Sequence, residues 1–103
     1  MDKEKAFNLA RQYADVVIQG LTPEKIILFG SYVNGEPNEN SDIDIAVIFN
    51  GFIGDWLHAY TWLSKATRKV SSYIEPLMID IQHDQSGFAA EILKTGELIY
   101  QQN

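Results

Sequence analysis

The chain has 103 residues, of which 46% are hydrophobic and 21% charged, a mixture typical of a folded domain. Eight basic and fourteen acidic side chains give a formal net charge of -6, which disfavours direct binding of a nucleic acid through its phosphates. The absence of cysteine excludes disulfides and thiolate sites, and no stretch approaches the roughly 20 apolar residues that cross a bilayer, so we expect a cytoplasmic protein without membrane contact.

The first half of the chain predicts a helix followed by two strands. Apolar side chains recur at three- and four-residue steps through residues 2 to 19, the pattern of an amphipathic helix that ends at Gly20. The run KIILF, residues 25 to 29, predicts a buried strand, and residues 31 to 33 are suited to opening a short helix after it. Residues 41 to 49, SDIDIAVIF, predict the second strand.

The second half of the chain predicts two more helices and a third strand. Residues 55 to 70 again place apolar side chains at helical spacing. Residues 72 to 81 predict a strand, in which Pro76 has no N–H group and therefore indicates an edge position or a bulge. Residues 86 to 95 predict a closing helix with Gly96 as its C-cap. The whole chain is thus expected to form a single α/β (α+β) domain, a small mixed sheet flanked by helices.

Two aspartates stand at the start of the second predicted strand. Because side chains alternate along a strand, Asp42 and Asp44 share one face with Ala46. Both faces become apolar further along, which predicts a strand covered on both sides with the aspartates at its mouth. Two like charges at such a site are tolerated when a cation lies between them. Mg²⁺ is the expected cation, because it prefers oxygen ligands and usually takes only one or two protein carboxylates.

A Gly-Ser turn precedes this strand in the sequence. Gly30 and Ser31 directly follow the first predicted strand. The backbone N–H groups and the hydroxyl of such a turn can point toward an anion, and glycine permits the anion to approach closely. Gly35 gives the following loop a second flexible point. The turn and the aspartate pair together predict a site for a metal-bound phosphate ligand.

The stretch Gly30-Ser31, ten residues, Asp42-Ile43-Asp44 resembles the signature of the DNA polymerase beta-type nucleotidyltransferase superfamily, and the short chain most resembles its minimal nucleotidyltransferase branch. The resemblance implies an α/β domain with a mixed sheet. It also implies that a nucleoside triphosphate, with ATP as the expected donor, binds with two Mg²⁺ ions and transfers its nucleoside monophosphate to a hydroxyl. Gly30 and Ser31 would then hold the triphosphate, and Asp42 and Asp44 would bind the metals.

Such enzymes usually need a third carboxylate on a neighbouring strand, and the third predicted strand offers two. Glu75 and Asp80 are five residues apart, so in a regular strand they point to opposite faces. We favour Glu75, because the sequence Ile-Glu-Pro resembles the third acidic position of many short relatives. The chain departs from many relatives at Asn34, where they carry an arginine.

The resemblance also implies a partner. Relatives in the minimal branch are commonly paired with a HEPN-type toxin, and some add AMP to a tyrosine of that toxin, as a type VII-like antitoxin. This predicts a hetero-oligomer with a HEPN-type protein. Two alternatives stay open: an antitoxin that acts only by covering its toxin, which the missing arginine at Asn34 favours, and a transferase for a small hydroxylated acceptor. Trp62 lies beside Lys65 on the predicted helix, so it either anchors a partner or packs at the flank of the core.

Overall fold

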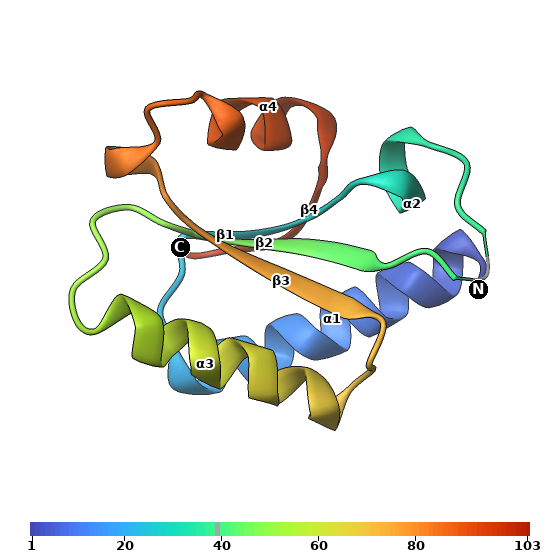
Figure 1. The fold of residues 1–103 in the computed structure, drawn as a ribbon, viewed down its shortest axis with the longest axis horizontal. Helices are drawn as coiled ribbons and strands as arrows, with labels where there is room; N and C mark the ends of the chain where they lie inside the picture. The colour runs from blue at the N-terminus through green and yellow to red at the C-terminus, as the bar shows by residue number, and fades with distance from the viewer. Residues whose placement is uncertain (39) are drawn as a thin grey trace.

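The computed structural model describes residues 1–38 and 40–103. Figure 1 shows the order of elements along the chain. These are α1 (Lys3–Gly20), β1 (Lys25–Phe29), α2 (Ser31–Asn34), β2 (Ile43–Phe49), α3 (Trp56–Ala66), the 3₁₀ helix η1 (Thr67–Lys69), β3 (Ile74–Asp80), the 3₁₀ helix η2 (Ile81–His83), α4 (Phe88–Thr95) and β4 (Glu97–Gln101). Each helix and strand predicted from the sequence is present, with boundaries that differ by a few residues.

The four strands form one mixed sheet in the order β3-β2-β1-β4. Strand β1 is antiparallel to both β2 and β4, whereas β2 and β3 are parallel. A parallel pair needs a crossover, and α3 supplies it between β2 and β3. The mixed sheet flanked by helices is therefore confirmed.

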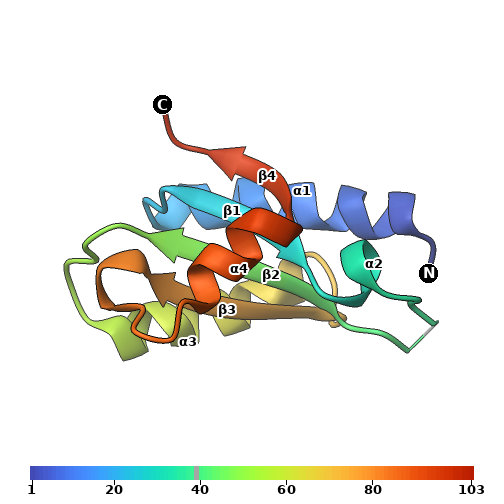
Figure 2. The same cartoon turned by 90° about the horizontal axis from the view of Figure 1, so that it is seen from above.

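Helices cover both faces of the sheet. Figures 1 and 2 show α1 and α3 on one face and α4 on the other. On β2, Ile45 and Val47 pack in the core with residues of α1 and α3, whereas Ala46 and Ile48 pack with Ala89 and other residues of α4. This confirms the prediction that the second strand is buried on both sides.

Among the strands that the structure describes, β4 is the one that the sequence did not predict. It pairs with the outer edge of β1, with a register irregularity between Ile26 and Ile27. The turn into it is tight: Gly96 donates its N–H to Ile92 O at 2.8 Å, and a Cβ at Gly96 would lie 3.0 Å from Leu28 O. Gly96 is thus both the predicted C-cap of α4 and the point at which the chain passes directly against β1.

Pro76 lies in β3, an edge strand of the sheet, as predicted. The register of β3 with β2 is regular along the strand, so the alternative of a bulge at Pro76 is wrong. Ile43 donates its N–H to Tyr73 O at 2.8 Å, so the backbone of Tyr73 faces β2. In a parallel ladder alternate residues face the same neighbour, so the backbone of Glu75 also faces β2 and that of Pro76 faces away from it. The missing N–H therefore costs the sheet nothing.

Within the part of the chain that the structure describes, no helix is both long and apolar enough to span a bilayer.

Candidate active site

Asp44 lies at the start of β2, between β1 and β3. Its register partners are Phe29, the last residue of β1, and Glu75 in β3. Register partners on neighbouring strands point to the same side of a sheet, so Asp44 and Glu75 share the face that carries α4. The helix packs over Ala46 and Ile48 further along β2, which leaves Asp44 half-buried at the end of the covered region.

Two other acidic side chains act on the charge of Asp44. Burial, followed by the negative charges of Asp42 and Glu75, raises the pKa of the Asp44 carboxyl above its usual range. Asp42 and Glu75 themselves are exposed. The residues Asp42, Asp44 and Glu75, which the sequence proposed as one set, thus lie near enough for their charges to interact, and we call them the acidic cluster.

The donor set suits a hard divalent cation that retains other ligands. Among the described residues, no group of three or more acidic, histidine or cysteine side chains is placed so that it could hold a metal ion by itself. One or two carboxylates at the exposed end of a strand are enough for Mg²⁺, which usually takes few protein ligands and completes its octahedron with water and phosphate oxygens. The chemistry of the residues present therefore fits that ion.

Gly30 brings the Gly-Ser turn against the aspartate. Its φ of 83° lies in the left-handed region, and a Cβ built at this position would overlap Asp44 Oδ2. The short helix α2 begins at the next residue, Ser31, as the sequence suggested, and Val33 and Asn34 donate their N–H groups back to Gly30 O. The turn and the carboxylate are consequently in direct contact, and only glycine permits this contact.

Tyr32 is a site residue that the sequence reasoning missed. It is buried, and its hydroxyl lies 3.4 Å from both Asn38 O and Ser41 O, so it links α2 to the segment that precedes Asp42. Burial, followed by the nearby Tyr73 and Asp42, raises the pKa of the Tyr32 phenol. The only signal in the sequence is an aromatic residue directly after the Gly-Ser pair.

Asp80, the alternative third carboxylate, lies at the other end of β3, where its register partner is Phe49. It is buried, and both of its oxygens accept backbone hydrogen bonds, from Gly51 N at 2.9 Å, Phe52 N at 2.7 Å and Gln82 N at 3.0 Å. These donors, Gly51 first, lower the pKa of the Asp80 carboxyl. The structure therefore places Asp80 as an anchor of the loop after β2, away from Asp44.

Replacing Asp80 with alanine should lower the melting temperature, because three backbone N–H groups lose their acceptor. The folded pKa is lowered, so the stabilisation is present above the unfolded value of about 3.9 and is lost as the pH falls through the folded value. The melting difference between wild type and Asp80→Ala should therefore shrink below about pH 4. The exposed Asp15→Ala is the matched control. A difference that stays constant from pH 7 to pH 2 would contradict this assignment.

Trp62 packs at the flank of the core, the second of its two predicted roles. It is half-buried, and a Cβ at Gly20 would overlap its ring, so α1 ends directly on this side chain. The apolar side chain that α3 exposes most is Leu57, at 71%. Trp56 is 40% exposed and packs edge-to-face on Phe52, with ring centroids 5.3 Å apart.

Several solved structures resemble this fold. A candidate nucleotidyltransferase from Sulfolobus solfataricus aligns with a TM-score of 0.69 at 20% identity, over 97% of this chain and 84% of that one. A chain of a toxin-antitoxin complex with AMP-PNP aligns with a TM-score of 0.63 at 23% identity, over 90% and 74%. A chain of the MntA-HpeT toxin-antitoxin complex, mutated from Asp to Glu at two positions two residues apart, aligns with a TM-score of 0.59 at 21% identity, over 90% and 74%. At these identities the likeness establishes the shared fold.

None of the curated proteins matches the sequence. The family model described as Polymerase beta, Nucleotidyltransferase matches residues 11–103, which include all the residues of the acidic cluster and the Gly-Ser turn. Because this match spans most of the chain, and the sheet and helices have the corresponding fold, the chain belongs to the polymerase beta nucleotidyltransferase family.

Proposed function

We propose that the chain is a magnesium-dependent nucleotidyltransferase that moves AMP, or another nucleoside monophosphate, from a nucleoside triphosphate to a hydroxyl. The observation that carries this proposal is the half-buried Asp44, flanked by Asp42 and Glu75 and touched by the turn at Gly30. In this proposal Gly30 and Ser31 hold the triphosphate, and the three carboxylates hold two Mg²⁺ ions. The ions supply charge neutralisation at the reacting phosphate.

The reaction needs little covalent chemistry from the protein. The acceptor oxygen forms a bond to the α-phosphorus, and the bond from that phosphorus to the bridging oxygen breaks, so pyrophosphate leaves with the electron pair. Glu75, which is exposed beside Asp44, takes the proton of the attacking hydroxyl. The turn at Gly30 and the carboxylate of Asp44 contribute mainly by positioning the two reactants.

The acceptor that we propose is a tyrosine of a HEPN-type toxin, which the chain would neutralise as an antitoxin in the cytoplasm. Two structural neighbours are chains of toxin-antitoxin complexes, one of them with AMP-PNP, and this supports both a toxin partner and an adenine nucleotide. The net charge of -6 also suits a partner whose own surface binds nucleic acid.

ATP labelled at its α-phosphate, incubated with this chain and with the protein encoded next to it, tests the proposal. With Mg²⁺, label is expected on the neighbouring protein, with no transfer after chelation of the metal. Asp44→Asn should abolish the label, while the exposed Asp15→Asn should leave it unchanged. The enzymatic assignment would be overturned if wild type put no label on the neighbouring protein, or if Asp44→Asn labelled it as strongly as wild type does.

A second candidate function is neutralisation by complex formation alone. The observation that favours it is Asn34, an exposed neutral residue at the position where many relatives carry arginine. In that case a variant with both Asp42→Asn and Asp44→Asn should still protect cells from the toxin. Loss of protection while the complex still forms would exclude this candidate. Free small hydroxylated molecules, offered in the same labelling reaction, test the remaining alternative.

A further inference from the structure

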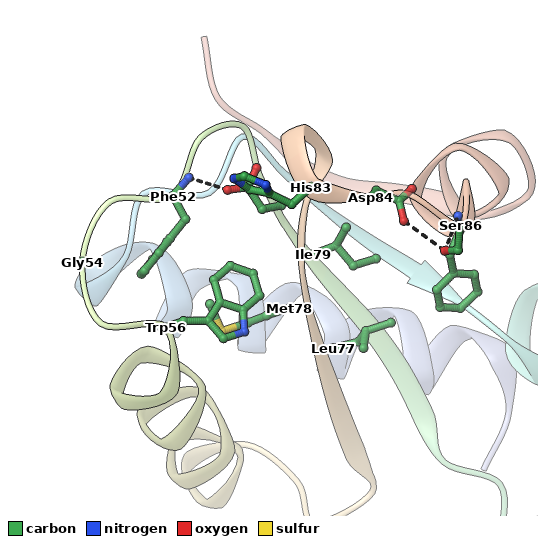
Figure 3. A pocket seen from close by; sticks show the side chains of 11 residues that line it. Phe52, Gly54, Trp56, Leu77, Met78, Ile79, His83, Asp84 and Ser86 are labelled. Carbon is green, nitrogen blue, oxygen red and sulfur yellow. Dashed lines mark hydrogen bonds between the residues drawn. The ribbon is translucent and has the colours of Figure 1, made fainter.

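A groove of about 500 Å³ runs along the outer edge of β3. Its wall on the α3 side consists of Phe52, Trp56 and Met78, and its wall on the α4 side consists of Leu77, Ile79 and Phe88. Figure 3 shows Phe52 and Trp56 on one side of the strand and Ser86 on the other. A groove of this size and apolar character lies in the range of protein sites for small ligands or peptide side chains.

The floor of this groove is a strand edge with free backbone groups. Within the described ranges, 1–38 and 40–103, strand β3 is the outermost strand and pairs only with β2. The alternation of the parallel ladder directs the backbone of Met78 into the groove, like that of Pro76. An extended segment lying in the groove can therefore pair with Met78 while its side chains alternate between the two apolar walls. Pro76 ends this pairing edge, because it has no N–H to donate.

The groove leads to the acidic cluster. Leu77 and Glu75 are two residues apart on the same face of β3, a distance of about 7 Å along a strand. On the same wall, the Phe88 ring packs edge-to-face on Phe29, with centroids 6.2 Å apart, and Phe29 is the register partner of Asp44. A side chain from a segment in the groove therefore has a short path to Asp44 and Glu75.

The charges around the groove favour a cationic occupant. Asp80 and Asp84 line it, and the backbone donors that hold Asp80 keep its carboxylate ionised at neutral pH. His83 is the only basic residue among the lining side chains, while the whole chain carries a net charge of -6. Lysine or arginine near an apolar segment would complement this rim.

We propose that the groove along β3 binds an extended peptide segment of a partner protein, with apolar side chains flanked by lysine or arginine, and that this segment delivers the acceptor hydroxyl to Asp44 and Glu75. The delivery step rests on the proposed transferase function. Peptide binding does not, because it depends on the strand edge, the two apolar walls and the acidic side chains of the rim.

The binding test uses the peptide acetyl-Lys-Val-Thr-Tyr-Val-Thr-Lys-amide and the fluorescence of Trp56. A Trp62→Phe background leaves Trp56 as the only tryptophan, and it lies in the groove. Saturable binding is expected, weakened at least about tenfold by Phe88→Ala and by exchange of both peptide lysines for glutamate. Phe88 is 46% exposed, so its truncation should leave the fold intact. Equal binding by Phe88→Ala, or no saturable binding by wild type, overturns the proposal.

Backbone methylation of the peptide tests strand pairing without changing the protein. Successive residues of a strand direct their N–H groups to opposite sides. Two peptides are compared, one methylated at every odd-numbered backbone nitrogen and the other at every even-numbered one. The peptide whose methyl groups face β3 should lose binding, and the other should keep it. Equal behaviour of the two peptides overturns strand pairing. Displacement of the peptide by ATP with Mg²⁺, read by Trp56, would instead assign the groove to the nucleotide and overturn the proposal.

Transfer and binding together separate the two proposals. Asp44→Asn should bind the peptide as wild type does but transfer no label to its tyrosine. Suppose that the peptide binds to wild type, binds more weakly to Phe88→Ala, and is never labelled. That result counts against delivery of the hydroxyl and against the transferase function. Labelled peptide whose KM is the same for wild type and Phe88→Ala counts against the groove alone.

Discussion

Asp44→Asn is expected to raise the melting temperature of the metal-free protein by a few degrees. It is also expected to lower nucleotide transfer at least about 100-fold, because even the mutation of a residue that hydrogen-bonds to a metal ligand can cause a loss of that size. The physical reason for the stability gain is the raised pKa of Asp44, caused first by burial and then by Asp42 and Glu75. Because the folded protein binds this proton more tightly than the unfolded chain, stability falls as the pH rises from the unfolded pKa through the folded one. A neutral amide at residue 44 removes that penalty.

Melting curves at pH 7 and pH 4, with chelator and with Mg²⁺ plus ATP, measure this effect. The gain of Asp44→Asn should be larger at pH 7 than at pH 4, because more of the wild-type carboxyl is deprotonated at the higher pH and the raised pKa penalises that form. Ligand should stabilise the wild type by about 2.7 kcal/mol at a hundred times its dissociation constant, and should stabilise the variant much less. Asp15→Asn, exposed on α1, should melt like wild type throughout. A variant less stable than wild type in chelator would show that Asp44 serves the fold.

Gly30→Ala should impair both stability and activity. The φ of 83° strains any residue with a Cβ by about 1–3 kcal/mol, and the new methyl group would overlap Asp44 Oδ2. Either the turn or the carboxylate must move, and a displacement of about 1 Å in a catalytic group can cost about 100-fold in rate. Chemical denaturation gives the first quantity, and the labelling reaction gives the second.

Gly87 offers a control for this variant. Its φ is 77°, and a Cβ at this position would meet no atom within 4 Å. With ψ at 11° it lies in the left-handed helical region, whereas the ψ of -150° at Gly30 lies in a region used almost only by glycine. Gly87→Ala therefore introduces a smaller backbone strain without the overlap. It should lose less stability than Gly30→Ala and keep its transfer rate with a small-molecule acceptor. Equal losses of activity in the two variants would show that strain alone, rather than the contact with Asp44, limits the reaction.

The sequence predicted those parts of the site that depend on neighbouring residues. The spacing of Gly30, Ser31, Asp42 and Asp44 is local, and alternation along one strand places both aspartates on the same face. Choosing between Glu75 and Asp80 required more, because it depends on the register of β3 against β2. That register pairs Glu75 with Asp44 and Asp80 with Phe49, and no pattern within β3 encodes it.

Two other features were hidden for a similar reason. Strand β4 is short and partly exposed, with Leu98 at 53%, so it lacks the continuous apolar pattern of a buried strand. Its existence depends on the free edge of β1, far away in the sequence. The helical period likewise predicts on which side of α3 Trp62 lies. It does not predict the contact with Gly20, which belongs to another helix. Long-range contacts of this kind need the folded chain.

The pairing of β4 with β1 has a consequence for biosynthesis. Strand β1 is complete at Phe29, but its outer neighbour begins only at Glu97. At about 5–20 residues per second, a ribosome needs several seconds to make the intervening chain. During that interval the nascent polypeptide carries an unpaired apolar strand, KIILF, which can pair with other nascent chains. Residues 97 to 101, which contribute nothing directly to the acidic cluster, close that edge to such pairing once they fold onto β1.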